Sequence, residues 1–207
     1  MTNENKSRKD SSVYVGLLLA AITFCCLSIV FAVKGVTAEK IMTENAKKQS
    51  ENFRLLLKGV KFNNNPNAEC YLADGFGSSP KKVYVARLNG KVSAYVVYYD
   101  VAGGYSTPFS MVAGVNADGT VNRVDVVEFN ETPGLGDKIL RSNGSYLDGF
   151  NGVSLANRNF DVKKYGGDFD FFTGATVTPR AVVRSTKSML ERLGSVDLDS
   201  LTKCEDQ

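Results

Sequence analysis

The chain has 207 residues, 25 basic and 22 acidic side chains, a formal net charge of +3 and no histidine. This length gives room for one domain of ordinary size, and the mixture of charges along the chain provides no concentrated basic face for nucleic acid phosphates. We therefore expect no nucleic acid partner. Without histidine the chain lacks the commonest general base and zinc ligand, so we also expect no metal held by protein side chains alone and no catalytic side chain.

An uncharged run of 21 residues, VYVGLLLAAITFCCLSIVFAV, occupies residues 13–33 and follows a polar head at residues 1–12. As a helix it measures about 31 Å, enough to cross a bilayer core of about 30 Å. We therefore predict one transmembrane helix after an unstructured cytoplasmic head. The alternative is a cleaved signal peptide with Val36-Thr37-Ala38 at the cleavage site, although this run exceeds the usual signal core of about 7–15 residues.

Lysine and arginine residues flank this run on both sides, so the positive-inside rule alone does not orient it. A short head, one span and a globular body are typical of a single-pass anchor in the inner (plasma) membrane. We expect residues 34–62 to form a stalk helix and linker, because they contain good helix formers with apolar positions at helical spacing. Residues 63–207 are expected to form the domain on the extracytoplasmic (periplasmic) side of the lipid bilayer. Cys70 and Cys204 could pair in an oxidising compartment, but the sequence leaves open whether they meet.

The sequence pattern changes to strands after residue 80. Two β-rich pairs follow one another, 82–88 with 91–99 around Asn89-Gly90, and 108–116 with 120–129 around Asp118-Gly119. Asn-Gly and Asp-Gly between such runs are the strongest short signals for a hairpin. We predict at least four antiparallel strands, followed by short helical pieces at LGDKILRS and GSYLDGF. The fold class is then α+β, a twisted antiparallel sheet with helices packed on it.

The stretch DFDFFTGATVTPRAVV, from Asp168 to Val183, places small and hydroxyl residues before a predicted helix. Thr178 suits the N-cap and Pro179 the first helical position. The helix then has an inward apolar stripe and ends at a glycine; these positions are Val182, Val183, Met189, Leu190, Leu193 and Gly194. Small residues at a helix start admit an anion such as phosphate to unpaired backbone N–H groups. An ordinary turn with a threonine cap explains the same residues.

The segment DFFTGAT, Asp170 to Thr176, resembles the flavinylation signature of the FMN-binding domain family: Asp, two variable residues, Ser or Thr, Gly, Ala and Thr. The resemblance implies FMN joined through its phosphate to Thr176 by a phosphoester bond. A separate magnesium-dependent flavin transferase makes this bond with FAD as donor. Thr173 replaces the more frequent serine, and Pro179 follows Thr178 where serine is usual, but neither change removes the acceptor.

A second segment, ETPGLGDKI, from Glu131 to Ile139, resembles the loop beside the isoalloxazine ring in the same family. Its glycines specify a tight, exposed backbone, and Leu135 offers an apolar contact for one face of the ring. Taken alone, the segment is also explained as a bend from strand into helix. The resemblance implies cofactor contacts from two groups of residues: Glu131, Thr132, Gly134, Leu135 and Gly136, and Thr173, Gly174, Ala175 and Thr178.

These blocks, in this order after one N-terminal span, are similar to the G subunits of Rnf electron-transport complexes. That resemblance implies an electron carrier whose covalent FMN passes electrons between other Rnf subunits in the membrane. The complex exchanges electrons between ferredoxin and NAD while moving sodium ions or protons. The alternatives are a membrane-anchored FMN-binding redox sensor or regulatory module, and the C subunit of a sodium-pumping quinone reductase, which shares the flavin motif.

Overall fold

The computed structural model describes residues 3–105, 108–129, 134 and 136–204. The chain divides into two compact units, residues 1–49 and residues 50–207. Helix α1 spans Asn3–Leu56 and makes up the described part of the first unit. The expectation of an unstructured head at residues 1–12 is therefore wrong, because α1 already begins at Asn3 and no proline or glycine in the head interrupts it.

Within α1, the 23 residues Val13–Gly35 form a segment long and apolar enough to cross a membrane. The segment contains the predicted span and extends two residues beyond it. Its side chains are not buried inside the protein, which leaves the apolar surface free to face lipid. The predicted stalk at residues 34–62 is helical as far as Leu56, where α1 ends.

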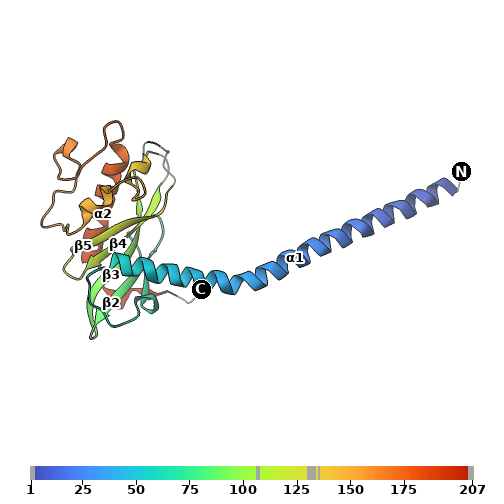
Figure 1. The fold of residues 1–207 in the computed structure, drawn as a ribbon, viewed down its shortest axis with the longest axis horizontal. Coiled ribbons are helices and arrows are strands. Elements are labelled where there is room, and N and C mark those ends of the chain that lie inside the picture. The colour runs from blue at the N-terminus through green and yellow to red at the C-terminus, as the bar shows by residue number, and fades with distance from the viewer. Residues whose placement is uncertain (1–2, 106–107, 130–133, 135, 205–207) are drawn as a thin grey trace. The chain divides into compact units, whose positions relative to one another are not determined.

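The second unit contains a six-stranded antiparallel sheet with the strand order β5-β4-β3-β2-β1-β6 (Figure 1). The strands are β1 Cys70–Ala73, β2 Lys81–Leu88, β3 Lys91–Val101, β4 Phe109–Asn116, β5 Val121–Glu128 and β6 Thr202–Lys203. Both predicted hairpins are present, as β2-β3 and β4-β5. Asn89 and Gly90 have φ angles of 52° and 80°, the positive values that a tight two-residue hairpin turn requires. The α+β fold class is thus confirmed.

The strands β1 and β6 extend the sheet beyond the two hairpins. A disulfide joins Cys70 at the start of β1 to Cys204 just after β6, with 5.3 Å between the Cα atoms. The backbone N–H of Cys204 also donates to the carbonyl of Cys70 at 2.9 Å. The pairing that the sequence left open is therefore formed, and it fastens the C-terminal strand to the edge of the sheet.

Opposite faces of the sheet are covered by different helices. Val97, Tyr99 and Val101 of β3 belong to the larger core cluster together with residues of helix α2, Val177–Gly194. Ala94 and Val96 of the same strand belong to a smaller cluster with Phe53, Leu56 and Leu57 at the end of α1. This alternation follows from the two-residue period of a strand.

The C-terminal end of α1 lies close to the sheet at Gly114 of β4. A Cβ atom at this position would lie 2.2 Å from the carbonyl oxygen of Leu56. The side chain of Asn122 in β5 donates to the same carbonyl at 2.6 Å and to that of Lys58 at 3.1 Å. Glycine is therefore needed at position 114 so that the end of α1 can lie against the strand.

Five short 3-10 helices connect the strands and α2 in the part of the chain that the structure describes. They are η1 Pro66–Ala68, η2 Gly136–Ile139, η3 Tyr146–Phe150, η4 Lys163–Tyr165 and η5 Leu198–Ser200. The helices η2 and η3 confirm the short helical pieces predicted at LGDKILRS and GSYLDGF.

Helix α2 starts at Val177, two residues before the predicted first helical position, Pro179. Thr176 is the N-cap, and Thr178 lies in the first turn with its side chain buried. The predicted cap is therefore wrong. The shift is tolerated because the N–H groups of the first turn have no helical partner, so that Pro179 fits at the third helical position as well as at the first. The predicted apolar stripe is confirmed, since all five of its side chains are buried.

Candidate functional site

The residues Phe172 to Ala175 form a tight turn directly before α2. Its ends are bridged, with the N–H of Ala175 donating to the carbonyl of Phe172 at 3.0 Å. Gly174 has a φ of 80°, the value that the third position of a type II turn requires and that glycine adopts without strain. Thr173 and Gly174 are exposed at the tip, whereas Ala175 is buried. The turn therefore projects two residues outward and returns the chain to Thr176.

Thr176 lies between this turn and the helix and is half-buried. Its carbonyl accepts the first helical hydrogen bond, from the N–H of Arg180 at 3.2 Å, but its hydroxyl makes no capping bond to α2. The first turn carries no acidic side chain, so the positive end of the helix dipole is not offset there. The Thr176 hydroxyl thus stands where a phosphoryl group would meet a favourable potential.

A cavity of about 660 Å³ lies beside the segment that leads to this turn. Its lining combines aromatic rings, cationic side chains and carboxylates, among them Tyr146, Phe169, Phe172, Lys138, Arg158, Lys163, Asp168 and Asp170. The volume is in the usual range for a pocket that takes a small organic ligand. Rings and cations together suit a planar, electron-poor ligand that carries negative charge.

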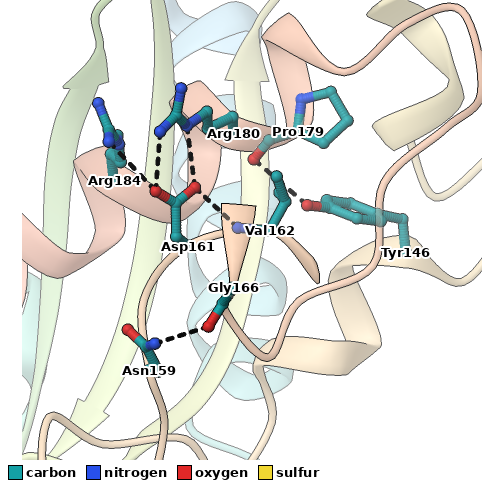
Figure 2. Close-up of polar contacts among 8 residues, drawn as sticks. All are labelled: Tyr146, Asn159, Asp161, Val162, Gly166, Pro179, Arg180 and Arg184. Atoms are coloured by element: carbon teal, nitrogen blue, oxygen red, sulfur yellow. Dashed lines mark hydrogen bonds and ion pairs between the residues drawn. The ribbon is translucent and has the colours of Figure 1, made fainter. Parts of the chain in front are cut away.

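Tyr146 connects this cavity to the start of α2. Its ring lies 5.2 Å from that of Phe172, and its hydroxyl donates to the carbonyl of Pro179 at 3.3 Å (Figure 2). Burial raises the pKa of Tyr146 well above its usual range, so the hydroxyl keeps its proton and remains a donor. One wall of the cavity is therefore fixed to the first turn of the helix that follows Thr176.

The C-terminal part of the predicted loop Glu131–Ile139 contributes to the same cavity. Gly134 is exposed with a φ of 83°, and the buried Gly136 begins η2, which packs against α2. Lys138 of η2 lines the cavity, as do Asp170 and Phe172 of the threonine motif. Glu131, Thr132 and Leu135 lie outside the described residues. Thr178 is buried in the first turn of α2, and any contact it makes with a cofactor stays a prediction.

A group of charged residues that the sequence did not indicate joins Asp161 to Arg180 and Arg184 of α2. The carboxylate of Asp161 accepts from Arg180 Nε at 2.9 Å, Arg180 Nη2 at 3.0 Å and Arg184 Nη2 at 3.1 Å (Figure 2). The Arg180 guanidinium also lies 3.7 Å from the centroid of the Tyr165 ring. The hydrogen bonds from Arg180 lower the pKa of Asp161 to about 2.

Little in the sequence signals this group, because a single aspartate and two arginines 19 and 23 residues later are usually solvated surface charges. The available signal is the pattern Phe160-Asp161-Val162, in which two buried apolar residues enclose a carboxylate. A carboxylate between two buried neighbours in an irregular segment needs partners, and basic residues on the next helix can supply them.

Comparison with known proteins identifies the class to which this fold and site belong. The FMN-binding domain family matches residues 104–191, which include the β4-β5 hairpin, the glycine loop, the cavity and Thr176. The chain is also similar over most of its length to proteins named as the G subunit of an ion-translocating oxidoreductase complex. The relative from Salmonella typhimurium is 36% identical over 177 residues, covering 83% of this chain and 86% of the relative.

Two further relatives with the same name agree with this result. The protein of Haemophilus influenzae is 38% identical over 176 residues, 83% of this chain and 85% of the relative. That of Erwinia tasmaniensis is 34% identical over 199 residues, 92% of this chain and 95% of the relative. The chain therefore belongs to the family of G subunits of ion-translocating oxidoreductase complexes, and it contains an FMN-binding domain.

Proposed function

We propose that this chain is the electron-carrying flavoprotein subunit of a membrane-bound, ion-translocating oxidoreductase complex, with FMN attached covalently to Thr176. The observation that carries the proposal is the convergence of two sequence motifs on one cavity. Lys138, within the segment ETPGLGDKI, belongs to its lining, and so do Asp170 and Phe172 of the threonine motif. Membership of the G-subunit family supports the assignment to such a complex.

The residues present fit FMN in two respects. The Thr176 hydroxyl is free of capping bonds at a helix start without acidic residues, as a phosphate ester requires. The cavity provides aromatic walls and three cationic side chains for the ring system, and Phe172, four residues before Thr176, belongs to its lining. Bound FMN would supply reversible acceptance and donation of electrons. This chain would hold the ring, keep part of it from water and set the charge around it.

Attachment needs an enzyme other than this chain. The Thr176 Oγ1 atom forms a bond to the FMN phosphorus of FAD while the bond from that phosphorus to the AMP portion breaks. AMP leaves, and the hydroxyl proton passes to a base. Because the chain has no histidine, we place that base on a flavin transferase, a magnesium-dependent partner that acts during maturation.

The proposal includes a location. The segment Val13–Gly35 anchors the chain in the plasma membrane, and residues 63–207 form the flavin domain on the extracytoplasmic (periplasmic) side. The Cys70–Cys204 disulfide supports this side, because disulfides persist in oxidising compartments. A covalent link also prevents loss of the flavin where it is not readily replaced. The other subunits of an Rnf-type complex then act as donor and acceptor, coupling ferredoxin and NAD to transport of sodium ions or protons.

The test is to produce the full chain with and without a flavin transferase and to examine it after denaturation. We expect flavin fluorescence on a denaturing gel and, on the peptide containing Thr176, a mass increase equal to FMN less one water. Thr176→Val should abolish both signals. Thr202→Val, which removes an exposed threonine hydroxyl of β6 outside the motif, should leave them in place. Flavin that stays on the Thr176→Val chain, or none on the wild type, would contradict the proposal.

A further inference from the structure

The segment that carries Thr176 is held at both of its ends by one residue, Asp161. At the first end, the backbone N–H of Phe169 donates to the carbonyl of Asp161 at 3.2 Å. The adjoining N–H of Lys163 donates to the carbonyl of Phe169 at 2.7 Å, and Val162 and Phe169 form a parallel bridge. The chain is thus fixed to residues 161–163 immediately before the motif DFFTGAT begins.

At the second end, the side chain of Asp161 holds the start of α2. Its two carboxylate oxygens each accept a hydrogen bond from the guanidinium of Arg180. The Oδ2 atom also accepts from Arg184, one helical turn later (Figure 2). Oδ1 accepts in addition from the N–H of Val162 at 2.8 Å. Paired donors in a planar fork fix orientation as well as distance. The Asp161 side chain is only 17% exposed, so water screens these contacts less than it screens a surface pair.

The backbone around Asp161 is packed too closely to shift without cost. A Cβ atom at Gly167 would lie 1.8 Å from the Asp161 carbonyl oxygen and 2.1 Å from its carbonyl carbon. On the other side, Tyr165 packs its ring against the guanidinium of Arg180. By contrast, the ion pair between Lys163 and Asp170, the second residue of the loop 169–180, is largely exposed, at 60% and 77% of the two side chains. The contacts of Asp161 therefore restrain the loop more than the exposed Lys163–Asp170 pair does.

We propose that Asp161 is a positioning residue for flavin attachment. It binds both ends of the loop 169–180, Phe169 and Arg180, and thereby fixes the direction in which the Thr176 hydroxyl meets the flavin donor. The inference rests on the proposed function. Asp161 acts through Arg180 and through the carbonyl that binds Phe169, and it does not touch the reacting atoms. Loss of the carboxylate frees the helix start from residues 161–163 while the β-sheet core stays intact.

The experiment measures the rate of flavin transfer from FAD to the full chain by a flavin transferase, using Asp161→Asn and Asp161→Glu. We expect kcat to fall about 10- to 100-fold for Asp161→Asn with the KM for FAD unchanged, since a misplaced nucleophile costs about this much. Asp161→Glu, which keeps a carboxylate for Arg180, should recover a large part of the rate. The double variant with Arg180→Gln should be little slower than Asp161→Asn alone.

A matched control separates positioning from stability. Glu69 is another part-buried carboxylate, which accepts from Arg87 Nε at 2.6 Å and Asn64 Nδ2 at 3.0 Å beside β1. Glu69→Gln should destabilise the chain to a similar degree while the transfer rate stays at the wild-type value. Equal rates for Asp161→Asn and wild type, or equal slowing by Glu69→Gln, would overturn the inference. Wild-type chain that accepts no flavin at all would instead refute the proposed function.

Discussion

The substitution Gly167→Ala tests the packing around Asp161 and the segment that leads to Thr176 most sharply. The added methyl group would meet the carbonyl oxygen, carbonyl carbon and Cα atom of Asp161 at 1.8, 2.1 and 2.6 Å. Ordinary contact begins at 3.4 Å, so the two backbone segments must separate by at least about 1.6 Å, a displacement that a close-packed region does not absorb freely.

That separation also breaks hydrogen bonds that join the segments. The N–H of Gly167 donates to the carbonyl of Val162 at 3.2 Å, and that of Phe169 to the carbonyl of Asp161 at 3.2 Å. Overpacking costs about 1–3 kcal/mol, and each lost bond adds about 0.5–1.5 kcal/mol. We therefore expect the free energy of unfolding to fall by about 2–6 kcal/mol, with slower flavin attachment at Thr176.

The assay is urea unfolding of the full chain in detergent, followed by tyrosine fluorescence because the chain has no tryptophan. Gly166→Ala is the matched control. Gly166 has a φ of 83° and open space around its Cβ position, so alanine there costs only the strain of the left-handed conformation, about 1–2 kcal/mol. Equal losses in the two variants would show that residues 161 and 167 are not in close backbone contact, and the reasoning would fail.

Three other predictions follow from the same structure. Gly114→Ala should lower the free energy of unfolding by about 1–3 kcal/mol, because its Cβ atom would lie 2.2 Å from the Leu56 carbonyl oxygen; urea unfolding that matches wild type would contradict that contact. Cys204→Ser should cost about 5 kcal/mol, since the disulfide joins residues with a sequence separation of 134, and reductant should then have no further effect on the variant. Because Arg180 lowers the pKa of Asp161 to about 2, below its unfolded value of about 3.9, this pair stabilises the fold fully above about pH 4 and its contribution disappears as the pH falls towards 2. Asp161→Asn should flatten the pH dependence of the free energy of unfolding across this range, and an unchanged slope would count against the pairing.

The parts of the fold that were predictable from sequence are those set by local interactions. Asn89 and Gly90 adopt the positive φ angles that their residue types allow, and the β-rich runs on either side of them form the strands β2 and β3. The strands β1 and β6 were not predicted, because they are four and two residues long. Their pairing depends on the sheet edge and on the Cys70–Cys204 bond, which no local pattern reveals.

In the candidate site, too, the features set by local interactions were predictable from sequence and the others were not. The turn before α2 was predictable because small residues and a glycine at position 174 are local requirements. Its interpretation as a flavin motif came from the resemblance to the FMN-binding domain family. The helix start was misplaced by two residues because Thr176 and Thr178 are equally good caps by residue type, and the tertiary packing that buries Thr178 decides between them. Asp161 was missed because its partners are 19 and 23 residues away on α2.

The central claim is that Thr176 is the attachment point of FMN, and mass spectrometry of the chain matured by a flavin transferase tests it most directly. After proteolysis, the peptide that contains Thr176 should carry the mass of FMN less one water, and fragmentation should place this mass on Thr176 itself. An unmodified peptide from a chain that nevertheless carries flavin, or a flavin placed on Thr173 or Thr178, would contradict the account.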